Sequence, residues 1–367
     1  MSAATERITS KSQVEKIADA VLYEGYILYP YRPSAVKNQR RWNFGVLCPE
    51  SYAQQQGGTE SAVMQTECLL EAESDTTISV QVRFLHLMQR EVAEAVDCQQ
   101  AAAACGHLVD ERGDHFKVVP FLQLGGKVLQ PWQEAVEREV TLPRLKGTDL
   151  GWAYSSKFIF PECTFQERLA ETSAEPAGGL LLRTQPALTG AIDIRARILD
   201  TQTENASRKL IRLAVAITNL TAFADAEERS RDDALMHSLV STHTILSVEQ
   251  GNFVSLLDPP DVYKAAATEC VNTGTFPVLV GDEGDLDCVL SSPIILYDYP
   301  QIAPESAGNL FDGTEIDEIL TLRIMSLSDD EKREMRDTDA LARQLLERTE
   351  TISAEQLMKL HGMMKKG

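Results

Sequence analysis

The chain has 367 residues, of which 43% are hydrophobic and 25% are charged, a composition that excludes a disordered, collagenous or coiled-coil protein. Its 55 acidic and 35 basic residues give a formal net charge of -20, which repels polyphosphate and argues against nucleic acid as a general partner. The polar first twenty residues, and the lack of an apolar run of about twenty residues elsewhere, predict a cytoplasmic protein without a membrane span.

A short helix is predicted at residues 13–22, because Ser12 and Glu15 form a capping box and apolar residues follow at helical spacing. These apolar residues are Val14, Ile17, Ala18, Val21 and Leu22. The aromatic residues and prolines from Tyr23 onward favour an extended strand, followed by a short strand at residues 44–47 and a loop at residues 54–59.

Residues 64–72 and 78–84 alternate apolar and polar side chains on either side of the polar residues 74–76, which predicts a β-hairpin. Residues 88–105 lose this alternation and are rich in Ala, Glu and Gln, so they predict a helix. A further strand is predicted at residues 116–124, with a glycine pair forming the turn after it.

The clearest strand pattern in the sequence is a pair of alternating segments at residues 192–198 and 211–217. One side of the pair is apolar and consists of Ile192, Ile194, Ala196, Ile198, Ile211, Leu213, Val215 and Ile217. The other side carries Asp193, Arg195, Arg197, Arg212, Ala214 and Ala216. This pattern predicts antiparallel strands with one face in solvent. Three more strands are predicted at residues 277–280, 288–290 and 293–297.

Segments without periodicity at residues 161–179 and 300–313 suggest domain boundaries. The predicted parts are a mixed β/α region at 1–175, an antiparallel β region at 176–305 and a helical segment at 306–367. Capping boxes that begin at Ser328 and Ser353 predict helices at 329–348 and 354–364. The predicted fold is therefore α+β and rich in β-structure, with antiparallel, sandwich-like sheets and a C-terminal helical hairpin.

The sequence contains none of the common catalytic signatures, since it lacks a phosphate-binding loop, a dinucleotide fingerprint, a GxSxG elbow, an HExxH helix and a CxxC pair. His237 and His243 have serines and aspartates nearby, but polar residues at the edge of an element explain them equally well. The seven scattered cysteines fit reduced, buried thiols better than a disulfide framework. We predict neither a catalytic residue nor a resident cofactor.

Two segments carry side chains that are suited to metal ions. Cys98, Cys105 and His107 offer thiolates and an imidazole to a soft divalent ion, although two buried cysteines beside a surface histidine is the alternative. The loop Gly281–Asp287 offers carboxylates to calcium or magnesium, and a solvated turn between two strands is the alternative there.

Residues 22–49 concentrate aromatic and cationic side chains in an otherwise acidic protein. The candidate partner-binding residues of this aromatic-basic segment are Tyr29, Tyr31, Arg32, Lys37, Arg40, Arg41 and Trp42. Aromatic residues and arginines dominate protein interfaces, because they bury a large area at a low entropic cost. Two alternatives are tyrosines that line a sheet edge beside solvated cations, and a site for single-stranded nucleic acid, which the overall charge opposes.

Two passages, YILYPYRPSAVKNQRRWNFGVLCP and LSSPIILYDYPQIAPESAGNLFDGTEIDEILTLRIMSLSDDEKREMR, resemble those of an uncharacterised bacterial family encoded among the genes of nickel–iron hydrogenases. The resemblance extends over most of the chain and implies an accessory role, with hydrogenase subunits or maturation proteins as partners. It supplies no functional residues. We therefore predict a non-catalytic accessory or assembly factor that acts through protein contacts. The alternative is a metal-dependent enzyme or a metal carrier.

Overall fold

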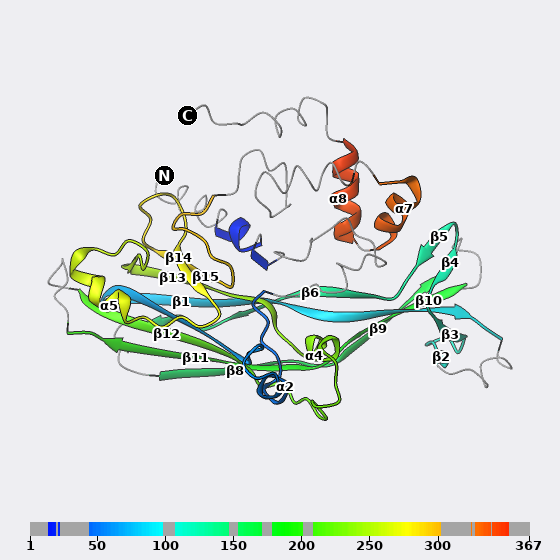
Figure 1. The fold of residues 1–367 in the computed structure, drawn as a ribbon, viewed down its shortest axis with the longest axis horizontal. Coiled ribbons are helices and arrows are strands. Elements are labelled where there is room, and N and C mark those ends of the chain that lie inside the picture. The colour runs from blue at the N-terminus through cyan, green and yellow to red at the C-terminus, as the bar shows by residue number, and fades with distance from the viewer. Residues whose placement is uncertain are drawn as a thin grey trace.

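The computed structural model describes residues 14–19, 21–22, 44–97, 107–146, 153–170, 178–200, 208–301, 324, 327–338 and 340–351. One strand of 33 residues, β1 (Val63–Ala95), runs along most of the molecule (Figure 1). Along one edge it pairs in turn with β12 (Lys209–Asn219), β7 (Leu145–Lys146), β6 (Trp132–Thr141) and β3 (His115–Val119). Along its other edge it pairs with β13 (Val240–Val254) and β10 (Gly179–Gln185). All of these pairings are antiparallel.

The remaining strands extend the sheet outward from these neighbours of β1. β11 (Leu188–Ile198) pairs with β12 and β8 (Ala153–Phe160) pairs with β11, while β9 (Cys163–Leu169) pairs with β10. On the side of β13 lie β15 (Cys288–Ser292) and then β14 (Phe276–Leu279). The hairpin strand β2 (His107–Val109) pairs with β3, and β4 (Leu122–Leu124) with β5 (Lys127–Leu129) forms a separate small sheet.

The main hydrophobic core lies between two layers of this one sheet. Val82 and Phe84 of β1 belong to the same buried cluster as Ile194 of β11, and the rings of Phe84 and Phe158 of β8 are 5.8 Å apart between centroids. Because β1 and β8 are not hydrogen-bonded to each other, the sheet must fold over so that the two layers face each other, as Figure 1 shows. The prediction of a β-rich, antiparallel, sandwich-like fold is confirmed.

The alternating segments predicted at residues 192–198 and 211–217 form β11 and β12, and Ile192 pairs with Ile217 in the antiparallel register. Seven of the eight predicted apolar side chains are buried, and each large one contributes roughly 1.5 to 3 kcal/mol of burial free energy. Ile198 is the exception, because it is the last residue of β11 and is 39% exposed.

The predicted hairpin at residues 64–72 and 78–84 is wrong, because both segments belong to β1. Residues 74–76 produce a bulge, since the register between β1 and β13 shifts there. The hydroxyl of Thr76 accepts a hydrogen bond from the backbone N–H of Glu73 at 2.8 Å and donates one to the carbonyl oxygen of Gln250. Thr76 is therefore satisfied within a continuous strand, and Ser74 and Asp75 are exposed.

The predicted helix at residues 88–105 is wrong in its described part, because residues 88–95 continue β1. They are paired on both edges, with β6 and β3 on one side and β10 on the other. Strand pairing on both edges outweighs the helix propensity of the alanines and glutamates in this segment. The short strands predicted at 44–47 and 293–297 are also wrong, since only an isolated bridge pair at Leu47 forms in the first and no strand forms in the second.

Short helices cover parts of the sheet. The described residues of the predicted first helix, 14–19 and 21–22, are helical, and all five of its predicted apolar residues are buried. Four of these five pack against β13, β14 and β15. Three other short helices are α2 (Glu50–Gln55), which takes up the start of the loop predicted at 54–59, α4 (Arg231–Met236) and α5 (Lys264–Thr268), which follows the 3-10 turn η3 (Asp261–Tyr263).

The predicted C-terminal hairpin of helices 329–348 and 354–364 is not confirmed. The first predicted helix is two helices, α7 (Asp329–Thr338) and α8 (Ala340–Thr351), and residues 354–364 lie outside the described residues. Met335 of α7 and Leu346 of α8 join the cluster around Trp132, so both helices contribute to the core on this side of the sheet. The three-part division at residues 175 and 305 stays a prediction, although strands on both sides of residue 175 belong to one sheet.

Candidate functional site

A groove lies on the solvent-facing side of the sheet, where β1, β12 and β11 run side by side. It has a volume of about 310 Å³ and is lined by Gln65, Glu67, Asp193, Arg195, Arg197, Arg212, Ala214 and Ala216. We call it the arginine groove, because three guanidinium groups line it in a protein whose net charge is -20.

The strand register explains why a groove forms here. Ala214 of β12 pairs with Glu67 of β1 on one side and with Arg195 of β11 on the other. Ala216, one step along the same face, pairs in the same way with Gln65 and Asp193. Each alanine is therefore flanked by two long side chains from the neighbouring strands, and the row of alanines becomes the floor between two walls.

The polar groups of Glu67 and Gln65, which form one wall of the groove, already have partners within the chain. The carboxylate of Glu67 accepts a hydrogen bond from the backbone N–H of Val271 at 2.9 Å, and the backbone N–H of Glu67 donates to the side-chain oxygen of Asn272 at 2.8 Å. Gln65 makes a backbone bridge with Thr273. These contacts fix the β1 wall against the segment that follows α5.

Two arginines face each other at one end of the groove, since Arg197 pairs directly with Arg212. Arg212 donates a hydrogen bond to the carboxylate of Glu269 at 2.6 Å, and this bond raises the pKa of Arg212 above its ordinary value. Its buried Nε has no hydrogen-bond partner among the described residues. Like charges on directly opposite residues destabilise a sheet. Glu269 reduces this repulsion, because its carboxylate compensates the charge of Arg212.

Arg195 and Arg197 are the other two cations that line the groove. Both are exposed, and neither forms an ion pair or side-chain hydrogen bond with any residue that the structure describes. They are two positions apart on one strand, so their Cα atoms are about 6.6 to 6.8 Å apart and their side chains leave the same face. Each guanidinium can bind a carboxylate through two parallel hydrogen bonds, so the pair matches two carboxylates at the same spacing.

The sequence predicted the polar face of β11 and β12 but not a site on it. The indication was present in β12, where two of the three polar-face positions between Arg212 and Ala216 are alanines. A small residue on a wet face leaves room that longer neighbours enclose. Which neighbours these are depends on the pairing of β12 with β1, and this long-range pairing does not follow from local sequence.

The seven predicted partner-binding residues, Tyr29, Tyr31, Arg32, Lys37, Arg40, Arg41 and Trp42, lie outside the described residues. The structure therefore leaves the aromatic-basic segment as a prediction. Cys98 and Cys105, two of the three candidate metal ligands, also lie outside the described residues, whereas His107 begins β2 and is exposed. A ring nitrogen of His107 lies 2.8 Å from one of His115, a residue that the sequence did not single out.

The acidic loop Gly281–Asp287 forms a turn between β14 and β15. The carboxylate of Asp285 accepts a hydrogen bond from the N–H of Asp282 at 2.9 Å, and the backbone carbonyl of Asp285 accepts one from the hydroxyl of Tyr299 at 3.0 Å. Gly281 has a φ of 126°, which a side chain would strain. Within the described ranges, no three His, Cys, Asp or Glu side chains lie close enough to share a metal ion.

The two histidines near serines also have structural partners. A ring nitrogen of His237 lies 3.1 Å from the carbonyl oxygen of Asp233, and a ring nitrogen of the fully buried His243 lies 2.9 Å from the carbonyl oxygen of Ser241. The hydroxyl of Ser238 donates to the carbonyl of Ala234 at 2.7 Å. These groups stabilise the ends of α4 and β13 and do not form a nucleophile–base pair with one another.

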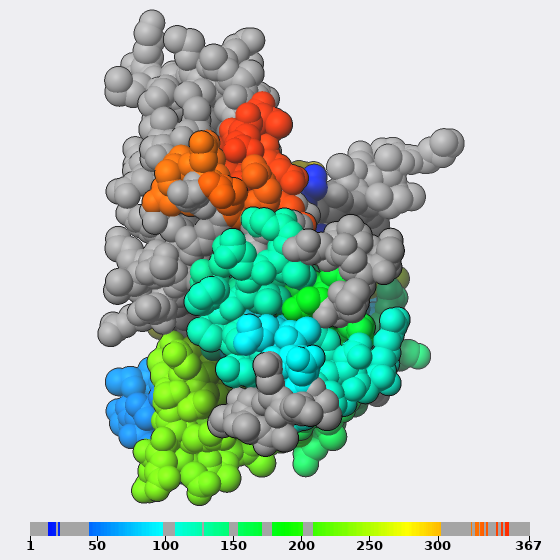
Figure 2. All heavy atoms as spheres, turned by 90° about the vertical axis from the view of Figure 1, so that its right-hand side faces the viewer, coloured from blue at the N-terminus to red at the C-terminus, as the bar shows by residue number. Residues whose placement is uncertain are grey.

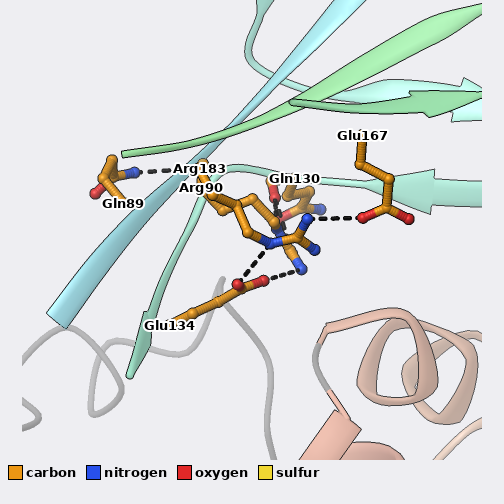
Figure 3. Close-up of polar contacts among 6 residues, drawn as sticks. All are labelled: Gln89, Arg90, Gln130, Glu134, Glu167 and Arg183. Atoms are coloured by element: carbon orange, nitrogen blue, oxygen red, sulfur yellow. Dashed lines mark hydrogen bonds and ion pairs between the residues drawn. The ribbon is translucent and has the colours of Figure 1, made fainter. Parts of the chain in front are cut away.

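A partly buried ion-pair network joins four strands at the other end of β1 (Figure 3). The carboxylate of Glu134 in β6 bridges Arg90 of β1 at 3.0 Å and Arg183 of β10 at 2.8 Å. Arg183 also pairs with Glu167 of β9 at 2.7 Å, and Arg90 donates to the carbonyl oxygen of Gln130. Burial lowers the pKa of Arg183, but its hydrogen bonds to Glu167 and Glu134 raise it further, so the guanidinium stays charged. The network is satisfied internally and has a structural role.

None of the known protein-family models matches the chain, and none of the curated proteins matches its sequence. Among the described residues, no helix is both long enough and apolar enough to cross a membrane. The arginine groove is built from charged side chains and enclosed by neighbouring strands, and two of its cations have no ion-pair partner among the described residues. It is therefore the candidate functional site.

Proposed function

We propose that this protein is a non-catalytic accessory or assembly factor, and that it binds an acidic, extended segment of a partner protein in the arginine groove. The observation that carries the proposal is the pair Arg195 and Arg197, two exposed guanidinium groups without ion-pair partners among the described residues. A cationic pair in a strongly acidic protein attracts anionic groups locally, while the net negative charge of the protein repels them.

The shape of the groove favours an extended occupant. Its floor follows the direction of β12, and its alanine side chains leave room for a peptide backbone. Side chains on one face of an extended segment repeat every second residue, which is also the spacing of Arg195 and Arg197. A segment with acidic residues at alternate positions therefore places two carboxylates against the two guanidiniums.

The partner class in this proposal is a protein, in the cytoplasm. The resemblance of two passages of the sequence to a hydrogenase-associated family makes a hydrogenase subunit or maturation protein the partner that we propose. The aromatic-basic segment with Arg40 and Arg41 would supply a second contact to the same partner, because arginines and aromatic side chains favour such interfaces.

Peptide binding tests the groove directly. The probe is a fluorescently labelled peptide with glutamates at alternate positions, and the readout is its anisotropy as the full chain is added. We expect saturable binding that weakens as salt is raised, because exposed ion pairs are screened. A peptide with serines in place of the glutamates should not bind.

A charge-reversal variant that carries Arg195→Glu and Arg197→Glu should lose this binding. The matched control is Arg144→Glu, because Arg144 is also exposed and pairs only with the exposed Glu249 at 3.0 Å among the described residues. If the double variant bound the acidic peptide as tightly as the control, the groove would not be the binding site and the proposal would be wrong.

A further inference from the structure

A pair of histidines lies on the β2–β3 hairpin, at the end of the molecule that Figure 2 turns toward the viewer. The Nε2 atom of His107 and the Nδ1 atom of His115 are 2.8 Å apart. The ring centroids are 5.0 Å apart and the ring planes differ by 15°. With the nitrogens this much closer than the centroids, the rings meet end to end, and the N–H of one imidazole donates a hydrogen bond to the lone pair of the other.

The hairpin holds both rings on one face. His107 pairs with Lys117, and Val109 pairs with His115, so the two histidines are diagonal neighbours on the same side of the ladder. The opposite side is anchored, because Phe116 is fully buried in a cluster with Ala93 and Leu180. β3 is itself paired with β1, so the backbone that carries His115 is part of the main sheet.

The turn that joins the two strands is also held in place. One carboxylate oxygen of Asp110 accepts hydrogen bonds from the backbone N–H groups of Arg112 and Asp114, both at 2.9 Å. Arg168 of β9 forms ion pairs with Asp110 and Asp114. The two imidazoles therefore project from a short, fastened hairpin, which lowers the entropic cost of bringing them to one ligand.

We propose that His107 and His115 chelate a divalent transition-metal ion of the class that prefers imidazole, such as zinc, nickel or copper. Metal–nitrogen bonds of this class are 2.0 to 2.1 Å long, so two imidazole nitrogens in neighbouring coordination positions are about 2.9 to 3.4 Å apart. The observed 2.8 Å separation needs to widen by only a few tenths of an ångström, with a rotation of the rings toward the ion.

Replacing the hydrogen bond between the two imidazoles with bonds to an ion requires one proton to change its position. In the hydrogen-bonded pair, one imidazole uses its facing N–H as the donor and the other uses its lone pair as the acceptor. To bind the ion, the donor ring moves its proton to its other nitrogen, and both facing nitrogens then present lone pairs. No proton is lost from the pair, and no oxidant or reductant is involved.

The site has two protein ligands among the described residues, since no third His, Cys, Asp or Glu side chain of those residues joins them. Water completes the coordination of an exposed ion, and such a site binds reversibly. Calcium and magnesium are disfavoured, because both prefer oxygen ligands. The site therefore suits a protein that takes up and releases a transition-metal ion, and it does not depend on the arginine groove.

Calorimetric titration of the full chain with zinc chloride tests this proposal, with nuclear magnetic resonance of the histidine ring signals as the second readout. We expect saturable binding that shifts the ring signals of His107 and His115. Single substitutions His107→Gln and His115→Gln should each weaken it by at least about tenfold, the loss that follows even when an outer-shell partner of a metal site is removed. His237→Gln is the matched control and should bind as the wild type does.

Two results would overturn the proposal that His107 and His115 bind a metal ion. One is a wild-type protein without saturable zinc binding, and the other is binding that stays unchanged in both His107→Gln and His115→Gln. The variant with Arg195→Glu and Arg197→Glu should keep its zinc binding, so a failure of the groove and a failure of the metal site are distinguishable. Since His107 is exposed, His107→Gln preserves the fold even if His115→Gln does not.

Discussion

The substitution Glu134→Gln provides the sharpest test of how the long sheet is held together. It removes the charge that bridges Arg90 and Arg183, which lie on two different strands. At contact distances near 3 Å and an effective dielectric constant of about 20, each ion pair has a gross attraction of about 5 kcal/mol, most of which offsets the cost of desolvating the charges. The side chain of Arg90 is only 5% exposed, so its charge would stay buried after the charge of Glu134 is removed.

Removing one member of a buried pair costs about 3 to 5 kcal/mol. We expect a loss in the free energy of unfolding near the lower end of that range for Glu134→Gln, because Arg183 is 22% exposed and keeps its second partner, Glu167. Urea unfolding followed by tryptophan fluorescence measures it, with Glu249→Gln as the control. That control breaks an exposed pair with Arg144 and should cost at most about 1 kcal/mol. Equal losses in the two variants would refute the structural role of the network.

Three further predictions concern the core. Val215→Asp places a carboxylate at a position that is 1% exposed, so the variant should unfold or aggregate, and a thermal melt like that of the wild type would contradict the sandwich core. Burial lowers the pKa of His86 and of His243 to about 4, so both histidines take up protons when the protein unfolds between about pH 4 and about pH 6.5. The free energy of unfolding should therefore fall by up to about 1.4 kcal/mol per pH unit for each histidine as the pH drops from about 6.5 to about 4. Urea midpoints across this range test it, and an unchanged slope in His86→Gln would contradict it. Burial raises the pKa of Cys288 to about 12 and also raises that of Cys68, so neither thiol should react with iodoacetamide in the native protein. Peptide mapping should find both cysteines unlabelled in the native protein and labelled in urea. Labelling of either in the native protein would contradict its burial.

The periodicity of apolar residues correctly predicted the elements that bury a single face. The first helix shows this, because its five apolar positions fall on one face and all are buried. The strands β11 and β12 show it as well, because their alternate residues divide between the core and solvent. Local sequence is sufficient in such cases, since a single face is buried and the register follows from it.

The length of β1 could not be predicted in this way. Its residues 74–76 have the composition of a turn, and its residues 88–95 have that of a helix. Both stretches are strand because distant segments pair with them: β13 holds the bulge, and β6, β10 and β3 flank the end. Propensity is a weak preference that such tertiary pairing overrides.

The two candidate sites have the same limitation. Arg195 was predicted to face solvent, but the groove exists because Ala214 separates it from Glu67, which is more than a hundred residues away in the chain. His107 was only a candidate metal ligand beside two cysteines, and the hairpin brings it to His115. In both cases the chemistry of one residue was visible in the sequence, and its neighbours came from strand pairing.

The proposed function depends most directly on the affinity of the arginine groove for carboxylates. The deciding measurement is the binding of the alternating glutamate peptide to the wild type, to Arg144→Glu and to the variant with Arg195→Glu and Arg197→Glu. We predict saturable, salt-sensitive binding to the first two proteins and none to the third. Binding of equal strength to all three, or to none of them, would contradict the proposal that this groove receives an acidic segment of a partner.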